Sequence, residues 1–240
     1  MALHEVRLLR REAVAEGTMA FWFSRPAGFG FRAGQSLLLG LIAPPETDGE
    51  GDSRTFTIAS APHEPELMVA TRMRDTAFKR VLKSLPLGAA LTIDGPNGEM
   101  ALEESPTRPA VFLAGGIGIT PFRSMALHAA QARLPHRILL FYGNRRREDA
   151  AFLGELQDIE RRNANFRLVA LMSEPQKSAQ PWSGETGFIR RELIERHVSE
   201  PKAALYYFAG PPAMTGAMHA LLEELGVAEG AMRYEEFYGY

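Results

Sequence analysis

Short runs in which apolar and polar residues alternate dominate the first part of the chain. They are Glu5–Arg11, Met19–Ser24, Gln35–Leu41, Ser53–Ile58, Glu66–Arg74 and Ala90–Asp94. Stretches rich in glycine, proline and acidic residues, such as GFGFRAG and APPETDGEGDS, separate them. Several short strands at this spacing are typical of an antiparallel β-barrel or sandwich.

One helix is predicted inside this β-rich region. Apolar residues recur at the spacing that places side chains on one helix face, at Phe78, Val81, Leu82 and Leu85. Asp75 or Thr76 can cap the start of this helix, and Pro86 and Gly88 follow its end.

The pattern changes after EESPTRP, where predicted strands alternate with predicted helices. The strands are Ala110–Ala114, His136–Tyr142, Phe166–Met172 and Ala204–Ala209, and the helices are Thr120–Ala132, Glu148–Arg161, Arg190–Arg196 and Pro212–Leu225. This alternation indicates a doubly wound parallel sheet. We therefore expect two domains, a β-barrel over residues 1–104 and an α/β domain over residues 105–240.

Charge and hydropathy exclude two classes of partner. The formal net charge of the 240 residues is -2, which provides no general attraction to nucleic acid or to anionic lipid. No apolar run approaches the ~20 residues that a membrane-spanning helix needs. The N-terminal segment MALHEVRLLRREAVAEG has scattered charges and no apolar core, unlike a secretory signal, so we expect a cytoplasmic protein.

The sequence contains no cysteine, which excludes disulfides, thiol nucleophiles and cysteine-held iron–sulfur clusters. The six histidines show neither HxH nor HxxxH spacing, and we expect no metal site. Any redox chemistry therefore requires a bound organic cofactor or a metal without thiolate ligands.

Two glycine-rich turns follow predicted strands of the second domain. GGIGITP (Gly115–Pro121) leads directly into a helix, and AGPPAM (Ala209–Met214) follows the last predicted strand. Glycine allows close approach of a ligand to the backbone, and the N–H groups at a helix start favour an anionic pyrophosphate. Both turns lie at carboxyl ends of strands, where open α/β sheets bind their ligands, so they can face one nucleotide from two sides.

Two further segments carry candidate chemistry. In RTFTIAS (Arg54–Ser60), Arg54 and Phe56 share one face of a predicted strand, which places a phosphate-binding guanidinium beside an aromatic ring. The chain ends in EEFYGY, and so many terminal aromatic residues indicate a docked tail. For Phe237 the alternative of an end strand that completes the sheet is the better interpretation.

These segments, in this order, resemble the ferredoxin-NADP reductase superfamily over essentially the whole chain. RTFTIAS resembles its flavin motif R-x-[YF]-[ST]-x-x-S, and GGIGITP resembles its nicotinamide pyrophosphate motif. YGNRRREDAAFLGEL, AGPPAM and EEFY resemble, respectively, the segment after the second nucleotide strand, the C-G-P-x-x-M motif and the acidic-aromatic tail. The resemblance implies a flavin-binding barrel followed by an NAD(P)-binding α/β domain, without an iron–sulfur domain.

The resemblance also implies roles for residues of the barrel. Arg54 would contact the flavin diphosphate and Phe56 would stack on the isoalloxazine. The Thr57 hydroxyl would form a hydrogen bond with flavin N5, the atom that accepts hydride. Ser60 is the last flavin-binding residue of the motif, and Thr76 would help to hold the FAD pyrophosphate.

Further roles fall on the second domain. The NAD(P)-binding turn would consist of Gly115, Gly116, Gly118, Thr120 and Pro121. Gly210 and Pro211 would close over the nicotinamide. Tyr238 would cover the other flavin face, with Glu236 beside it as a proton-carrying or electrostatic group, so that Thr57, Glu236 and Tyr238 are the catalytic candidates.

The sequence departs from the family pattern at three places. Phe56 stands where tyrosine is commoner, and Ala209 stands where many members have cysteine. The chain continues beyond Tyr238 as Gly239 and Tyr240, so which terminal aromatic residue stacks on the flavin stays open.

The identity of the nucleotide also stays open. Arg145, Arg146 and Arg147 could hold the 2′-phosphate of NADPH, and we include Arg145 among the cofactor-binding residues. Glu174 would disfavour that phosphate and could accept hydrogen bonds from the ribose hydroxyls of NADH.

The implied reaction is hydride transfer from NADH or NADPH to FAD, followed by electron delivery to a protein such as ferredoxin, flavodoxin or an oxygenase component. We hypothesise that an acidic carrier docks on a basic cluster of Arg72, Arg74, Lys79, Arg80 and Lys83. The alternatives are an electron-input subunit of a larger complex and a non-catalytic nucleotide-binding module. FMN is a less favoured alternative to FAD.

Overall fold

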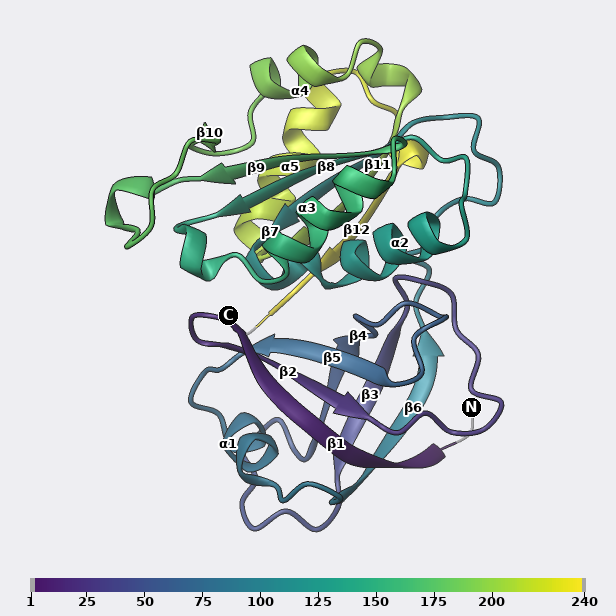
Figure 1. Cartoon of the computed structure of the whole chain (residues 1–240), viewed down its shortest axis with the longest axis vertical. Helices are drawn as coiled ribbons and strands as arrows, with labels where there is room; N and C mark the ends of the chain where they lie inside the picture. Colours follow the sequence, from purple (N-terminus) through teal and green to yellow (C-terminus); the bar gives the residue numbers. More distant parts are fainter. Residues whose placement is uncertain (1–2, 239–240) are drawn as a thin grey trace.

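The computed structural model describes residues 3–238, and its first domain is a curled antiparallel sheet (Figure 1). The strands are β1 (Leu3–Ala15), β2 (Thr18–Phe23), β3 (Ser36–Leu41), β4 (Ser53–Thr57), β5 (Leu67–Arg72) and β6 (Ala90–Asn97). They lie in the order β4-β3-β6-β1-β2-β5. Just beyond β4, the Ala59 N–H donates to the Met68 carbonyl at 2.7 Å, which brings the two edge strands together. The predicted antiparallel β-barrel is confirmed.

Strand β2 shows why the barrel has two apolar surfaces. Its side chains alternate between the faces of the sheet. Phe21 and Phe23 belong to the core inside the barrel, whereas Ala20 and Trp22 belong to the core of the second domain. A strand that is apolar on both faces therefore lies between the two cores and joins the domains.

Helix α1 (Ala77–Ser84) packs on the barrel core through Phe78, Val81 and Leu82, as predicted. Thr76, and not Asp75, is the N-cap, since its side chain accepts the Lys79 N–H at 3.4 Å. This cap fixes the position at which the helix begins, beside the end of β5.

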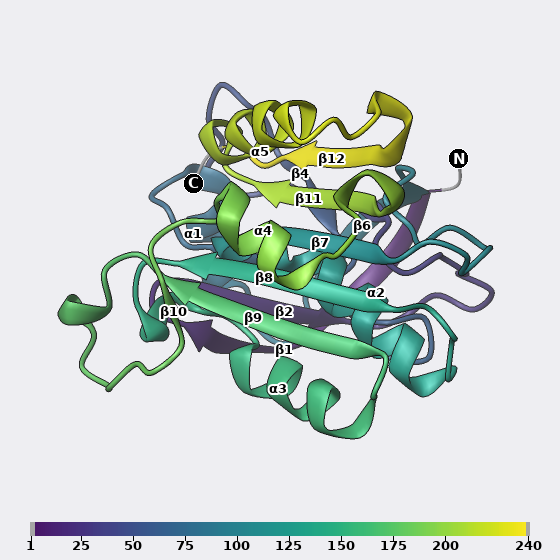
Figure 2. The same cartoon turned by 90° about the horizontal axis from the view of Figure 1, so that it is seen from above.

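The second domain is built on a six-stranded parallel sheet. Its strands are β7 (Ala110–Gly115), β8 (Ile138–Asn144), β9 (Phe166–Met172), β10 (Glu185–Thr186), β11 (Leu205–Gly210) and β12 (Met232–Glu236). The helices α2 (Thr120–Gln131) and α3 (Leu153–Arg162) lie on the face toward the barrel, with α4 (Arg191–His197) and α5 (Pro212–Glu224) on the other (Figures 1 and 2). The predicted doubly wound sheet is confirmed. None of the helices in residues 3–238 is long and apolar enough to cross a membrane.

In the strand order β10-β9-β8-β7-β11-β12, β7 is the strand at which the chain changes from one side of the sheet to the other. From β7 the chain proceeds through β8 and β9 on one side and returns to β11 and β12 on the other. A crevice opens at such a switch point beyond the carboxyl ends of the strands. The turns after β7 and β11 are the two glycine-rich segments, so both meet at this crevice.

The predicted helix Glu148–Arg161 is wrong at its start, because α3 begins only at Leu153. The Asp149 carboxylate accepts from both the backbone N–H and the guanidinium of Arg146, which stabilises a separate turn. Phe152 then takes a left-handed conformation with φ of 60°, which interrupts the helical path.

Strand β12 ends at Glu236, directly before the predicted tail residues Phe237 and Tyr238. β12 pairs in parallel with β11, and the Phe237 N–H continues the ladder to the Gly210 carbonyl at 2.9 Å. The Phe237 backbone thus extends the pairing of the sheet by one hydrogen bond beyond the end of β12. Gly239 and Tyr240 lie outside the described residues.

The fold predicts that Gly118→Ala destabilises the protein. A Cβ at this position would lie 2.2 Å from the carbonyl oxygen of Ala209, a backbone atom that cannot move without shifting β11. We expect a loss of about 1–3 kcal/mol or more in the free energy of unfolding, measured by urea denaturation. The control is Gly216→Ala on the exposed side of α5, where a Cβ meets nothing within 4 Å. It should raise stability by up to about 1 kcal/mol, and equal effects of the two changes would contradict the argument.

Candidate functional site

A pocket of about 420 Å³ lies where the barrel, the start of α2 and the end of β12 meet. Figure 1 shows the chain after β12 descending from the upper domain onto the barrel at this place. Seven predicted site residues line the pocket, namely Arg54, Phe56, Thr57, Thr76, Thr120, Glu236 and Tyr238. The other lining residues were not among the predicted site residues, namely Ser36, Glu50, Thr55, Ala70, Thr71, Lys79, Glu235 and Phe237.

Strand β4 presents Arg54 and Phe56 on one face, as the alternation predicted. The Arg54 guanidinium lies 5.2 Å from the ring centroid of Phe78, and the rings of Phe56 and Phe78 are 5.8 Å apart. Arg54 also donates to Asp48 at 2.8 Å and pairs with Glu50 at 3.0 Å. The Glu50 side chain is 75% exposed, so this partner can be displaced by another anion.

Thr57 ends β4 with a buried hydroxyl group. Thr57 lines the pocket, and its buried Oγ1 has no hydrogen-bond partner within residues 3–238. A buried hydroxyl without a partner is destabilising, so such groups point to a missing ligand. The atom therefore offers a donor and an acceptor to a molecule in the pocket.

Lys79 adds a second positive charge near Arg54. Burial lowers the pKa of its ammonium group, and the neighbouring charges of Arg74 and Arg54 lower it further. The two cations that line the pocket, Arg54 and Lys79, thus repel each other, and an anionic ligand would relieve that repulsion. Lys79 follows the Thr76 cap by three residues, a spacing that could have identified it from the sequence.

The two carboxylates of β12 face opposite sides of the sheet. Glu236 accepts from the Thr215 hydroxyl of α5 at 3.1 Å and from the Tyr238 hydroxyl. Glu235 points to the barrel, and its Oε1 lies 3.5 Å from the position that a Cβ on Gly98 would occupy. Burial raises the pKa of Glu235 to about 7. The Glu235 carboxyl group can therefore hold a proton near neutral pH.

The resemblance to the family named Glu236, beside Tyr238, and did not point to Glu235. Alternation along β12 separates the two side chains, because the Tyr234 ring stacks on Phe208 and contacts His219 of α5, which leaves Glu235 on the barrel side.

The two glycine-rich turns lie against each other at the switch point. A Cβ on Gly210 would lie 3.4 Å from the Gly115 backbone, and a Cβ on Gly115 would lie 2.1 Å from Met214 Sδ. Gly116 has φ of +54° and open space at its Cβ position. The structure thus brings together all the predicted turn residues, with Pro121 in the first turn of α2 and Pro211 capping α5.

The arginine run after β8 is divided between different contacts. Arg146 pairs with Asp149 at 2.9 Å and with Glu16 at 3.1 Å, so it supports the loop. Arg145 is exposed, and its carbonyl accepts the Glu174 N–H at 2.8 Å, which places these two residues together at the ends of β8 and β9.

Ser60 does not line the pocket. Its hydroxyl accepts the Met68 N–H at 3.0 Å, and its carbonyl accepts from Ser124 of α2 at 2.7 Å. The last serine of the flavin motif therefore joins the domains, which alternation along β4 could not indicate.

The predicted basic docking cluster is smaller than expected. Lys79 is buried in the pocket, and Arg80 pairs with Glu46 and Asp75. Only Arg72, Arg74 and Lys83 remain from that cluster on this surface.

Two other polar groupings lie away from the pocket. A depression of about 550 Å³ at the opposite, amino-terminal edge of the parallel sheet is lined by Arg108, Arg137 and Arg167. His219, Glu223 and Glu229 offer ligand atoms within 4.8 Å of one another near α5, where two of the three side chains are exposed. Ligands of open α/β sheets bind at the carboxyl ends of the strands, so neither grouping belongs to the site described above.

Comparison with known sequences identifies the second domain. Residues 112–220 match the family described as oxidoreductase NAD-binding domain. The chain is 28% identical over 239 residues to the glycine betaine monooxygenase reductase subunit of Chromohalobacter salexigens, covering 98% of this chain and 64% of that protein. It is 30% identical over 186 residues to a subunit of the Na(+)-translocating NADH-quinone reductase of Idiomarina loihiensis, covering 76% of this chain and 44% of that one. The chain thus spans less than two thirds of these relatives.

Solved structures share the complete two-domain fold. A cytochrome P450 reductase from Amycolatopsis superposes with a TM-score of 0.82 at 23% identity, over 98% of this chain and 70% of that one. A ferredoxin NADP+ reductase from Neisseria gonorrhoeae, with bound FAD and NADP, superposes with a TM-score of 0.80 at 22% identity, over 98% of both chains.

The raised pKa of Glu235 predicts a pH-dependent stability difference. The folded carboxyl group titrates near pH 7 and the unfolded one near 4.5, so the folded state binds more protons between these values and the protein loses stability as the pH rises. Glu235→Gln removes this loss. We expect the variant to exceed the wild type by at most about 3 kcal/mol above pH 7 and to differ little near pH 4.

Urea unfolding of the flavin-free protein from pH 4 to 8.5 measures this difference. Glu236→Gln is the matched control, because Glu236 is partnered by two hydroxyl groups. A pH-independent difference for Glu235→Gln would refute the assignment of the raised pKa to this residue.

Proposed function

We propose that this chain is a member of the ferredoxin-NADP reductase superfamily that transfers hydride from NAD(P)H to a bound FAD and passes the electrons to a protein acceptor. The observation that carries the proposal is the unpartnered, buried hydroxyl of Thr57 in a pocket shared by the flavin motif and the nucleotide turn. When bound, the flavin supplies the capacity to accept a hydride and to release electrons singly.

The residues of the pocket fit a flavin. Arg54 and Lys79 provide positive charge for its diphosphate, with the N-cap Thr76 beside them. The Glu50 carboxylate now bound to Arg54 is largely exposed, so a diphosphate can replace it without burying an unpaired charge. Phe56 and the tail residues Phe237 and Tyr238 provide aromatic surface on the pocket wall.

Two polar groups serve the reacting end of the pocket. The Thr57 hydroxyl orients the ring edge by a hydrogen bond, and the Glu235 carboxyl group, with its pKa of about 7, can hold or release a proton beside it. Glu236 is instead held by Thr215. We therefore propose Thr57 and Glu235 as the polar groups at the site of hydride transfer, with Glu236 supporting the tail.

We further propose NADH as the preferred donor. Arg146 is committed to Asp149 and Glu16, which removes one cation that a 2′-phosphate would need. Glu174 lies beside Arg145, where its carboxylate disfavours a phosphate and suits ribose hydroxyls. The relative from Idiomarina loihiensis is named as part of an NADH-quinone reductase, which agrees with this choice.

The acceptor is proposed to be a separate protein, with an oxygenase component first among the candidates. One relative is named as the reductase subunit of a monooxygenase. Both relatives are named as subunits, and the chain spans 64% and 44% of them. These names also support the second candidate, an electron-input subunit of a larger complex.

The visible absorbance spectrum of the purified protein, recorded without oxygen, tests the reaction. We expect a flavin band that bleaches on addition of either nucleotide, faster with NADH than with NADPH. A protein that stays colourless after incubation with FAD and FMN would overturn the proposal and favour a non-catalytic nucleotide-binding module.

Arg54→Ala is expected to weaken FAD binding. Loss of a charge-assisted contact to the diphosphate corresponds to about 1.5–3 kcal/mol, or roughly ten- to a hundredfold in Kd, measured by quenching of flavin fluorescence. Arg80→Ala is the control, because Arg80 is an exposed residue of α1 that pairs with Glu46 and does not line the pocket. Similar losses in both variants would indicate a general charge effect and not a diphosphate contact.

A further inference from the structure

Arg123 is a buried arginine on the helix that follows the nucleotide turn. Only 6% of its side chain is exposed, although it lies on the surface that α2 presents to the barrel. A buried guanidinium is costly unless all its donors are satisfied. Arg123 meets this requirement, because its five hydrogen bonds match the five N–H groups of the guanidinium.

These five hydrogen bonds divide between the two domains. Within its own domain, Arg123 forms a two-point pair with Glu155 of α3, at 2.7 and 2.8 Å. Across the domain junction, it donates to the Ala59 carbonyl at 2.7 Å and to the two Glu64 oxygens at 3.0 and 3.3 Å. One planar group therefore connects α3, α2 and the segment after β4.

The barrel side of this connection is itself rigid. Glu64 Oε2 accepts the Ala61 N–H at 2.6 Å, and Ala59 donates to Met68 on β5. The neighbouring Ser124 donates to the Ser60 carbonyl at 2.7 Å and accepts the Gly34 N–H at 3.3 Å. Arg123 and Ser124 thus bind the backbone carbonyls of Ala59 and Ser60, in the segment that follows Thr57.

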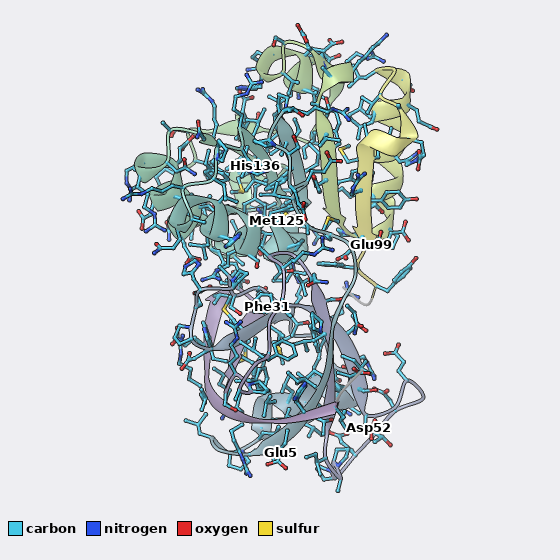
Figure 3. The ribbon with its side chains drawn as sticks, turned by 90° about the vertical axis from the view of Figure 1, so that its right-hand side faces the viewer. Glu5, Phe31, Asp52, Glu99, Met125 and His136 are labelled. Carbon is cyan, nitrogen blue, oxygen red and sulfur yellow. The ribbon has the colours of Figure 1, made fainter. Side chains whose placement is uncertain are left out.

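The same helix carries a pocket residue at its start. Thr120 begins α2, lines the pocket and follows the Gly115–Pro121 turn, and Arg123 lies three residues later, less than one helical turn on. Figure 3 labels Met125 of α2 at the base of the upper domain and Phe31 at the top of the barrel, on the two sides of this junction. The contacts of Arg123 with Ala59 and Glu64 therefore link the helix that follows the nucleotide turn to the chain segment that follows Thr57.

We propose that Arg123 is a positioning residue, which aligns the nucleotide turn with the flavin strand through its contact with Ala59 and Glu64. It touches neither the pocket nor the reacting atoms. The inference rests on the proposed reaction, since the alignment matters for catalysis only if hydride crosses between the two domains. A misplacement of about 1 Å can slow such a transfer by up to about a hundredfold.

Glu64→Gln and Glu155→Gln form a matched pair that isolates the contact between domains. Both remove one negative charge from Arg123, and the two glutamate side chains are similarly exposed, at 29% and 33%. Glu64 belongs to the barrel, whereas Glu155 lies on α3 in the same domain as Arg123. Arg123→Lys adds a third variant, because an ammonium with three donors cannot make all five hydrogen bonds.

The first measurement is the rate of flavin bleaching in the flavin-loaded protein at saturating NADH, followed by stopped flow. We expect Glu64→Gln and Arg123→Lys to slow bleaching by about tenfold or more, with little change in the nucleotide concentration at half-saturation. The bleaching rate of Glu155→Gln should stay within threefold of the wild-type rate, even if its thermal unfolding midpoint falls as far as that of Glu64→Gln. Equal slowing by both glutamine variants, or none by Glu64→Gln, would overturn the proposal.

Amide hydrogen exchange provides a measurement that does not depend on activity. Glu64→Gln should increase exchange in residues 59–64 and in α2, whereas Glu155→Gln should increase it mainly in α3. Unchanged exchange at residues 59–64 in Glu64→Gln would also refute the inference. If NADH and NADPH both fail to bleach the wild-type flavin, the proposed function fails, while the exchange data still decide whether Arg123 aligns the domains. If Arg123→Lys does not fold, the glutamine pair decides.

Discussion

The hydrogen-bonded contact between α2 and the barrel is the constraint on which the site depends. Arg123 and Ser124 bind the backbone carbonyls of Ala59 and Ser60 at 2.7 Å, directly beyond β4. Around these hydrogen bonds the apolar core of the α/β domain extends to Trp22 and Met68 of the barrel. Apolar contact provides most of the attraction between such surfaces, whereas buried hydrogen bonds select one orientation, since any other orientation leaves them unpaired.

This fixed orientation creates a pocket that neither domain contains alone. The barrel contributes Arg54, Thr57 and Lys79, and the second domain contributes Thr120 and the end of β12. Positive charge gathers at one end, and the Glu235 carboxyl group lies where burial keeps its pKa near 7. The separation of charge matches a ligand that is anionic at one end and exchanges protons at the other.

Much of the fold followed from local patterns. Period-two alternation predicted the barrel strands, and the alternation of strands with helices predicted the parallel sheet. The start of α3 was missed because Arg146 and Asp149 form a separate turn and Phe152 takes a left-handed conformation, neither of which helical periodicity registers. The role of Ser60 was also beyond the sequence, because its carbonyl meets Ser124 at a distance of 64 residues along the chain.

The sequence by itself determined the order of elements, the two glycine turns and the candidates Arg54 and Thr57, because backbone conformation and side-chain alternation are local properties. Only the tertiary structure decided that Glu235 faces the barrel and has a raised pKa, that Lys79 is buried in the pocket, and that Arg146 pairs with Glu16. Each of these outcomes depends on burial and on partners distant in the chain. Those are properties of packing, which no window of neighbouring residues contains.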